Sequence, residues 1–210
     1  MSELSRIPVT GESNYEVLVG RFLLDEIPRL IPPSSKKVLL VHPVALSTSA
    51  EAVRERLQAE GFEVLLAGVP DSEDAKRVEV AAFCWQIMGQ ADFTRTDSVI
   101  GFGGGSTTDL AGFVAGTWLR GVPLILIPTT LLGMVDAAIG GKTGVNTAEG
   151  KNLVGVFHAP SAVVVDLETL NTLNRNEILA GFGEVVKCGF IQDAEILNLI
   201  EADLAAATDP

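Results

Sequence analysis

Five short apolar segments recur along this chain, and helix signals separate them. They span residues 38–41, 63–66, 98–100, 124–127 and 162–165. Their apolar character is continuous rather than alternating, which is typical of strands buried on both faces of a parallel sheet. Between the first two, Ser47 or Ser49 can cap a helix that Gly61 ends. The pattern predicts a doubly wound α/β fold, with a Rossmann-like parallel sheet covered by helices on both faces.

The pattern changes near Asn174, where the strand signals cease. Residues 177–190 and 193–206 both predict helices. We therefore expect two domains, a sheet domain over residues 1–177 and the beginning of an all-helical domain over residues 178–210. The residues before Lys36 are interpreted as a turn-rich start.

Composition excludes several classes of protein. Of the 210 residues 47% are hydrophobic, which is enough for a sizeable core, and the formal net charge of -12 argues against binding to nucleic acid or to an anionic membrane. The longest uncharged stretch, between Arg120 and Asp136, is broken by two prolines and is too short for a membrane span. Two cysteines form no disulfide framework, so a cytoplasmic location is expected.

A glycine-rich turn follows the third apolar segment. Residues 101–109 read Gly-Phe-Gly-Gly-Gly-Ser-Thr-Thr-Asp, and a helix is expected from Leu110 to Leu119. Glycine lets the backbone approach a pyrophosphate closely, and a helix N-terminus offers unpaired N–H groups. Ser106 stands where the last glycine of G-x-G-x-x-G would be, so a nucleotide site and a plain tight turn both stay open.

Polar residues and glycines gather after the fourth apolar segment. Ligands of open α/β sheets bind outside the carboxyl ends of the strands, so this density predicts an anion site. A P-loop is excluded, because Asp136 occupies the position where that motif needs a glycine. The candidates are Arg120, Asp136, Lys142, Lys151 and Asn152.

Glu184 and Lys187 share one face of the predicted helix over residues 177–190. A surface ion pair is the common outcome of such spacing. The neighbouring residues are apolar and glycine-rich, so the pair is expected to be partly buried. A metal ligand, a general base or an anion contact are then also open.

Several motifs, in this order, together resemble the 3-dehydroquinate synthase family. The likeness runs from about residue 36 to the end of the sequence. The motifs are Pro70-Asp71-Ser72-Glu73 with Lys76, Gly103-Gly104-Gly105 with Asp109, Arg120-Gly121, Pro128-Thr129-Thr130-Leu131-Leu132, Val135-Asp136, Gly140-Gly141-Lys142-Thr143, Gly150-Lys151-Asn152 and Glu184-Val185-Val186-Lys187.

The resemblance implies a lyase of the shikimate pathway that depends on NAD and a divalent metal, zinc or cobalt. Its sugar-phosphate substrate, 3-deoxy-D-arabino-heptulosonate 7-phosphate, is converted to 3-dehydroquinate and phosphate by internal redox, phosphate elimination and aldol closure. It implies substrate contacts by Arg120, Asp136, Lys142, Asn152 and Lys187, and a metal ligand at Glu184. It implies NAD contacts by Asp71, Ser72, Glu73, Asp74, Ala75, Lys76, Gly105, Ser106, Thr107, Thr108, Asp109, Thr129, Thr130, Lys142, Lys151, Thr169, Leu170, Asn171 and Thr172.

The sequence departs from the family pattern at several points. Ser72 replaces a glycine, and Ser106-Thr107-Thr108 replace apolar residues. The family's two metal-binding histidines would lie beyond Pro210, so we expect this chain alone to be an inactive portion of a longer synthase that is a homodimer. The alternatives are another sugar-phosphate cyclase, an NAD-dependent polyol dehydrogenase of the same fold, or a non-catalytic NAD-binding module.

Overall fold

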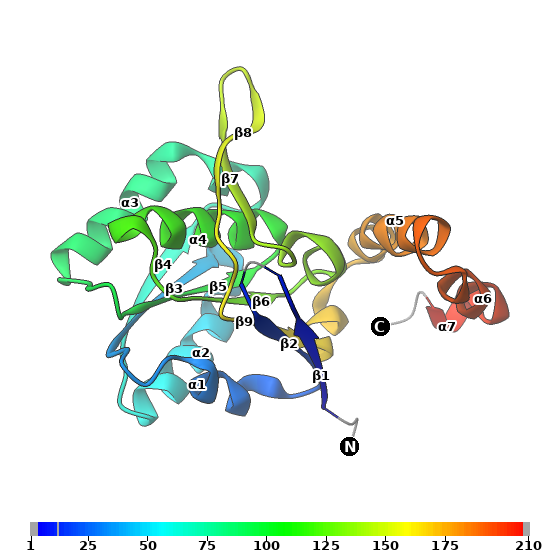
Figure 1. Ribbon diagram of the computed structural model, residues 1–210, viewed down its shortest axis with the longest axis horizontal. Coiled ribbons are helices and arrows are strands. Elements are labelled where there is room, and N and C mark those ends of the chain that lie inside the picture. The colour runs from blue at the N-terminus through cyan, green and yellow to red at the C-terminus, as the bar shows by residue number, and fades with distance from the viewer. Residues whose placement is uncertain (1–3, 12, 208–210) are drawn as a thin grey trace.

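A computed structural model describes residues 4–11 and 13–207 of the chain. Positions 1–3, 12 and 208–210, which fall within the two expected domains, lie outside the described residues. The centre of the molecule is a seven-stranded sheet of order β1-β2-β9-β6-β5-β3-β4, in which only β1 is antiparallel to its neighbour (Figure 1). Its strands are β1 Ser5–Val9, β2 Tyr15–Gly20, β3 Lys37–Pro43, β4 Glu63–Val69, β5 Ser98–Gly103, β6 Leu124–Pro128 and β9 Ala162–Asp166. The predicted doubly wound α/β fold is confirmed.

The inner strands bury alternate side chains on opposite faces of the sheet. In β3, Leu39 and Val41 join one core, while Val38 and Leu40 join the other. Because both faces are covered, no position in these strands needs a polar residue, which explains their continuous apolar runs. All five predicted strands are present.

Helices cover the two faces as the topology requires (Figure 1). On one face lie α1 (Ile27–Leu30) and α2 (Ser47–Ala59), which add residues such as Ile27 and Leu57 to one core. On the other lie α3 (Val78–Gln90) and α4 (Gly105–Thr117), which contribute Met88 and Leu110 to the second core. Short 3-10 segments lie at Leu23–Glu26 (η1), Val44–Leu46 (η2), Ser72–Lys76 (η3), Trp118–Arg120 (η4) and Leu167–Thr172 (η6), with a π-helical turn at Gly133–Ala137 (η5).

The helix expected from Leu110 to Leu119 has different ends. It begins at Gly105, so residues 105–109 form its first turn rather than a loop before it. It stops at Thr117, because Leu119 and Arg120 adopt left-handed φ of 48° and 67°. After β4 the chain forms η3 and an extended Arg77, and α3 begins only at Val78.

The polar and glycine-rich residues after β6 include a two-stranded hairpin, β7 (Lys142–Thr147) and β8 (Gly150–Phe157). It projects from the sheet face that α4 covers (Figure 1). The hairpin packs against Gly112 and Gly116 of α4. A Cβ on Gly112 would collide with the Thr143 side chain, and one on Gly116 would approach Val156 Cγ1 to 2.8 Å. The absence of side chains at these two positions lets helix and hairpin pack in direct contact.

The start of the chain is also more ordered than expected. β2 pairs in parallel with β9, and β1 pairs with β2. The carboxylate of Asp166, at the end of β9, accepts hydrogen bonds from the N–H groups of Phe22 and Leu23 at 3.1 and 2.8 Å. The expectation of a turn-rich start was wrong for this segment, because β1 and β2 are stabilised by pairing that is remote in sequence.

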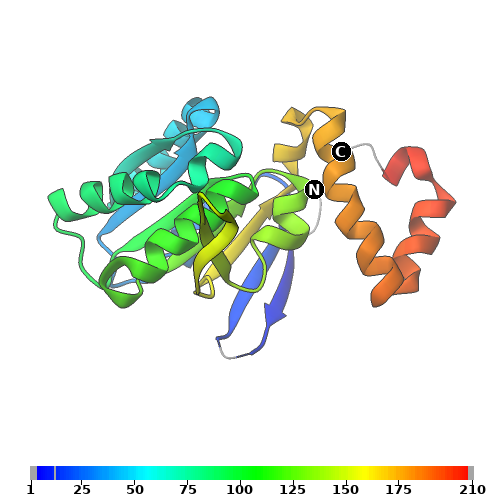
Figure 2. The same ribbon diagram turned by 90° about the horizontal axis from the view of Figure 1, so that it is seen from above.

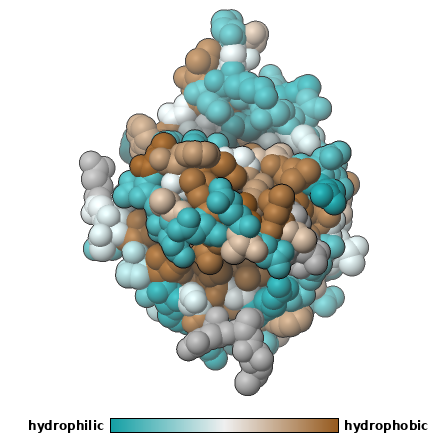
Figure 3. Space-filling model, turned by 90° about the vertical axis from the view of Figure 1, so that its right-hand side faces the viewer, coloured by the Kyte–Doolittle hydropathy of each residue, from teal (hydrophilic) through white to brown (hydrophobic). Residues whose placement is uncertain are grey.

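The two predicted C-terminal helices are present, as α5 (Arg175–Ile191) and α6 (Ala194–Ala202), with a short α7 (Leu204–Ala207) after a break. Figure 2 shows them to one side of the sheet, and Figure 3 shows apolar side chains on this side of the molecule. Exposed members include Phe190 and Leu199. No helix among the described residues is long and apolar enough to cross a bilayer. The boundary at residue 178 stays a prediction.

Candidate functional site

Four of the segments predicted to contact NAD follow parallel strands at the same edge of the sheet. η3 follows β4, the first turn of α4 follows β5, residues 129–130 follow β6, and η6 follows β9. These strands are parallel, so their carboxyl ends meet at one edge, where ligands of such sheets bind. The fold therefore brings the four predicted NAD-contacting segments to a single side of the sheet.

The glycine turn presents the N-terminus of α4 to this edge. Gly104 is the N-cap residue and offers no side-chain cap to the helix. A Cβ on Gly104 would lie 3.1 Å from Thr130 Cγ2, and one on Gly105 would lie 3.1 Å from Ala137 Cβ. Larger side chains at both positions would crowd the turn. The combination of small residues and an uncapped helix N-terminus suits the close approach of a phosphate.

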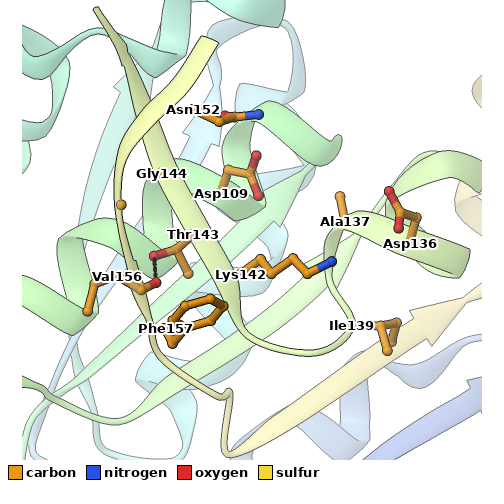
Figure 4. Close-up of a pocket in the computed structure, with 11 residues that line it drawn as sticks. Asp109, Asp136, Ala137, Ile139, Lys142, Thr143, Gly144, Asn152, Val156 and Phe157 are labelled. Carbon is orange, nitrogen blue, oxygen red and sulfur yellow. Dashed lines mark hydrogen bonds between the residues drawn. The ribbon is translucent and has the colours of Figure 1, made fainter.

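Beside this turn lies a cavity of about 470 Å³. Four polar side chains line it, from α4, η5 and the hairpin: Asp109, Asp136, Lys142 and Asn152. Figure 4 shows the Lys142 side chain extending from β7 toward Ala137 and Asp136. The remaining wall includes Thr143, Val156 and Phe157. Three of the five predicted substrate contacts, Asp136, Lys142 and Asn152, thus line one cavity.

Asp109 is the carboxylate that burial perturbs most clearly at this site. Burial raises the pKa of Asp109, and the ammonium group of Lys76 acts against that rise. Lys76 forms an ion pair with Asp109 and also donates a hydrogen bond to Asn152 Oδ1. The Lys76 side chain is only 4% exposed, so its ammonium group contacts protein groups rather than solvent.

A second set of contacts joins η3 to the hairpin. Asn146 Nδ2 donates to Glu73 Oε2 at 2.7 Å, and the Lys151 ammonium lies 3.5 Å from Glu73 Oε1. The hydrogen bond from Asn146 lowers the pKa of Glu73, with Lys76 and Lys151 acting in the same direction. Asp71, Ser72 and Asp74 are exposed around this junction.

Glu184 and Lys187 form the ion pair that their spacing allows. The side chain of Glu184 is 28% exposed and that of Lys187 is 52%, so only the carboxylate is partly buried. The hydrogen bond to Glu184 raises the pKa of Lys187, and Asp136 contributes in the same direction. The helix that carries the pair, α5, packs against η5, which carries Asp136, but neither Glu184 nor Lys187 lines the cavity. Gly181 fixes this approach, since a Cβ there would lie 2.6 Å from the backbone nitrogen of Leu132.

No group of three or more potential metal-ligating side chains occurs among residues 4–11 and 13–207. Glu184 is a single carboxylate that is paired with a lysine. A catalytic zinc usually has three protein ligands. The described residues by themselves therefore do not form a metal centre.

The structure does not bring Arg120 to this cavity. Arg120 follows the C-terminal end of α4, whereas Asp109 lies in its first turn. The eight residues of helix from Asp109 to Thr117 correspond to roughly 12 Å along the axis, and Arg120 lies three residues further on. Arg120 is exposed near the start of β6, at the opposite edge of the sheet from the other predicted substrate contacts.

The remaining predicted NAD contacts lie at the ends of β6 and β9. Thr129 is buried, and its N–H donates to the Gly103 carbonyl at 2.9 Å. Thr130 Oγ1 accepts a hydrogen bond from the Gly133 N–H at 3.1 Å, which fixes the chain as it enters η5. The four residues Thr169, Leu170, Asn171 and Thr172 belong to η6. The Thr169 hydroxyl donates to the Asp166 carbonyl at the end of β9, and the Thr172 hydroxyl donates to the Thr169 carbonyl.

The sequence analysis missed the apolar wall of the cavity and the role of Asn146. Val156 and Phe157 line the cavity from β8, and Phe157 is 86% exposed. A signal for this hairpin was present in the sequence, since the β-branched residues Thr143, Val145 and Thr147 alternate before the turn at residues 148–149. It was obscured by the glycines and polar residues that the segment also contains.

Comparison with known proteins identifies the family. A family model described as the N-terminal part of 3-dehydroquinate synthase matches residues 66–180. A 3-dehydroquinate synthase from Leifsonia xyli is 61% identical over 208 residues, which cover 99% of this chain and 58% of that protein. One from Pseudarthrobacter chlorophenolicus is 59% identical over 207 residues, covering 97% of this chain and 57% of that protein.

A solved structure of a related synthase has a similar fold. The 2-epi-5-epi-valiolone synthase ValA from Streptomyces hygroscopicus, with NAD+ and Zn2+ bound, superposes with a TM-score of 0.82 at 31% identity, covering 97% of this chain and 57% of that one. The chain spans a little under three fifths of the length of the curated relatives named above. The family model matches more than half of the sequence, and the chain belongs to the 3-dehydroquinate synthase family.

Proposed function

We propose that this chain carries the NAD-binding part of a 3-dehydroquinate synthase, the enzyme that forms 3-dehydroquinate and phosphate from 3-deoxy-D-arabino-heptulosonate 7-phosphate. The observation that carries the proposal is the cavity beside the uncapped N-terminus of α4, where Asp109, Asp136, Lys142 and Asn152 meet. The identities of 59–61% to proteins of that name support it over the valiolone synthase, which is 31% identical.

The glycine turn fits the pyrophosphate of NAD. Backbone N–H groups of the first turn of α4 would hold the phosphates, and the positive end of the helix would favour their charge. Thr129, Thr130 and η6 would border the rest of the cofactor along the sheet edge. NAD, when bound, supplies a hydride acceptor that is restored within the same turnover.

The cavity residues would bind and orient the substrate. The Lys142 ammonium is an exposed cation that can neutralise charge on a departing phosphate. The carboxylate of Asp136 and the amide of Asn152 can bond to hydroxyl groups, which would hold the ring carbon beside the cofactor. Lys187 lies on α5, which packs against η5, and we propose it as a further cation for the substrate phosphate.

We propose Glu184 as one ligand of a divalent metal, zinc or cobalt, in the complete enzyme. The described residues supply one carboxylate for such a site, so no step is assigned to the metal. We also propose a reducing, cytoplasmic environment, since Cys84 and Cys188 are both free thiols. A homodimer of the complete protein stays a prediction that light scattering can test.

Calorimetric titration with NAD tests the cofactor site on the chain as it exists. Ser106→Asp places a carboxylate in the first turn of α4, where it suits the helix but repels a pyrophosphate. We expect the wild-type chain to bind NAD, Ser106→Asp to lose most of that affinity, and the uncharged Ser106→Asn to keep it. Equal affinity in all three would refute the assigned pyrophosphate position.

Phosphate release from the sugar phosphate, with NADH absorbance followed in the same sample, tests the reaction class. We expect no release by this chain alone and no accumulation of NADH. Accumulation of NADH with a polyol would indicate a dehydrogenase instead. NAD binding with no recovery of phosphate release in a full-length version would indicate a non-catalytic module.

A further inference from the structure

Lys76 occupies an unusual place for a lysine. Its side chain is only 4% exposed, although lysine is seldom fully buried unless it is paired. Its ammonium group contacts Asp109 in α4 and Asn152 in β8, two residues that line the cavity. Lys76 itself does not line it. One buried cation thus joins three segments, η3, α4 and the hairpin, behind the cavity wall.

We propose that Lys76 is a positioning residue that fixes the amide of Asn152, and with it the hairpin, in the orientation that the cavity needs. This inference rests on the proposed function for its consequence in catalysis, but the contact itself is independent of it. A direct cofactor contact is the role that the family resemblance implies for Lys76. Its burial supports a role behind the wall instead.

The chemistry of lysine decides which end of the amide faces the cavity. An ammonium group has three donors and no acceptor, so the Asn152 oxygen must be the atom that contacts it. The Nδ2 group is then left to donate. Figure 4 shows the Asn152 amide beside the cavity above Asp109. A donor at this position can bond to a hydroxyl or a phosphate oxygen of a ligand, whereas an amide oxygen there could only accept from a hydroxyl and would repel a phosphate.

The backbone at Asn152 supports this arrangement. Its φ is +57°, in the left-handed region that asparagine tolerates better than most residues. This conformation interrupts the regular alternation of β8 and allows the side chain to reach Lys76. The Asn152 N–H donates to Asn146 Oδ1 at 3.0 Å, and Asn146 in turn donates to Glu73 of η3. The hairpin is therefore joined to η3 through both of its strands, by Asn146 of β7 and Asn152 of β8.

The competing explanation is that Lys76 is buried at this position only to neutralise the charge of Asp109. A buried carboxylate left without its cation would be costly, so Lys76→Met can destabilise the chain for that reason alone. The double variant Lys76→Met/Asp109→Asn removes both charges together. If Lys76 serves only to neutralise Asp109, the double variant restores the wild-type hairpin. If Lys76 positions Asn152, the hairpin stays loose in both variants.

Hydrogen–deuterium exchange over residues 142–157 of the full chain measures the hairpin directly. Loss of a hydrogen bond to a charged donor predicts roughly tenfold to hundredfold faster exchange there, in Lys76→Met/Asp109→Asn and in Asn152→Ala. Asn152→Asp keeps an acceptor for Lys76 and should keep the wild-type rate. Lys36→Met is the matched control, because Lys36 is exposed near the start of β3 at the other edge of the sheet.

Wild-type exchange in the double variant would overturn the proposal, as would faster exchange in Asn152→Asp equal to that of Asn152→Ala. Calorimetry with NAD on the same samples separates the two proposals. A loosened hairpin in a chain whose wild type binds no NAD would support the Lys76 contact and refute the cofactor site. NAD binding together with wild-type exchange of the hairpin in the double variant would support the cofactor site and refute the positioning role of Lys76.

Discussion

Replacing Gly112 with alanine should destabilise the chain, although alanine favours a helix. The gain in helix propensity is about 1 kcal/mol. The new Cβ would collide with Thr143 Cγ2 and lie 3.1 Å from Thr143 Cβ. Thr143 has little room to move, because it is β-branched and its hydroxyl donates to the Val156 carbonyl at 2.6 Å. Overpacking of this kind costs about 1 to 3 kcal/mol, so the net loss in free energy of unfolding is about 0 to 2 kcal/mol.

A double-mutant cycle isolates the collision. Thr143→Ser removes the colliding methyl group and keeps the hydroxyl, at a cost of up to about 0.8 kcal/mol. In the Gly112→Ala background it should instead stabilise the chain, giving a coupling energy of about 1 to 3 kcal/mol and a double variant close to wild type. Gly183→Ala in α5 is the control, because no atom lies within 4 Å of the added Cβ.

Urea unfolding, followed by tryptophan fluorescence, measures these differences. Trp85 is a suitable probe, since its ring centroid lies 6.0 Å from that of Phe113 in α4. A rise in stability for Gly112→Ala equal to that for Gly183→Ala would refute the reasoning. So would a coupling energy with Thr143→Ser below about 0.5 kcal/mol, the usual limit of additivity.

Three further predictions follow from buried groups. Burial raises the pKa of the Cys84 thiol to about 12, so iodoacetamide at pH 8 should alkylate Cys188 alone in the folded chain. Intact-mass spectrometry measures the number of labels, and rapid addition of two labels would contradict this prediction. Burial acts to raise the pKa of Asp97, but four hydrogen bonds to the carboxylate outweigh this effect and lower the pKa. The stability that Asp97 contributes is therefore present above its unfolded pKa of about 3.9, and it is lost as the pH falls through the lower pKa of the folded chain. Asp97→Asn should therefore lose stability at pH 7 and converge on wild type in acid, and a constant difference across urea titrations at several pH values would contradict the sign. Leu40→Ala should lower the free energy of unfolding by about 2 to 5 kcal/mol, since Leu40 is fully buried in an inner strand of the sheet. A loss under about 1 kcal/mol by the same assay would show that the surrounding core collapses into the cavity.

The sequence predicted five strands, β3 to β6 and β9, among them the edge strand β4, and it did not predict β1, β2 or the β7–β8 hairpin. β3, β5, β6 and β9 were evident because strands buried on both faces need apolar residues throughout. β1, β2 and the β7–β8 hairpin depend on contacts with distant segments, so their local sequences carry weaker signals. The hairpin in particular is held by glycines of α4 that lie in another part of the chain.

The candidate site was predictable to a similar extent. Residues that follow parallel strands must meet at one sheet edge, and this rule brought the predicted NAD-contacting segments together. The contact between Lys76 and Asn152 could not be predicted, because it joins residues 76 apart in sequence through an unexpected hairpin. The position of Arg120, by contrast, could have been predicted from the sequence. Most of α4 separates Arg120 from Asp109, and this length of helix places Arg120 far from the cavity.

The parallel pairing of β2 with β9 sets the order of events during synthesis. Glu16 aligns with Ala162, so roughly 140 residues must be made after β2 before its partner strand exists, which takes about 7 to 28 seconds at ribosomal rates of about 5 to 20 residues per second. Throughout that interval the first two strands have no sheet to join. β3, β4 and β5 can assemble earlier, because their partners follow one another closely. A nascent chain stalled before residue 162 should therefore hold a folded centre and an unpaired N-terminal arm open to chaperones or to other chains.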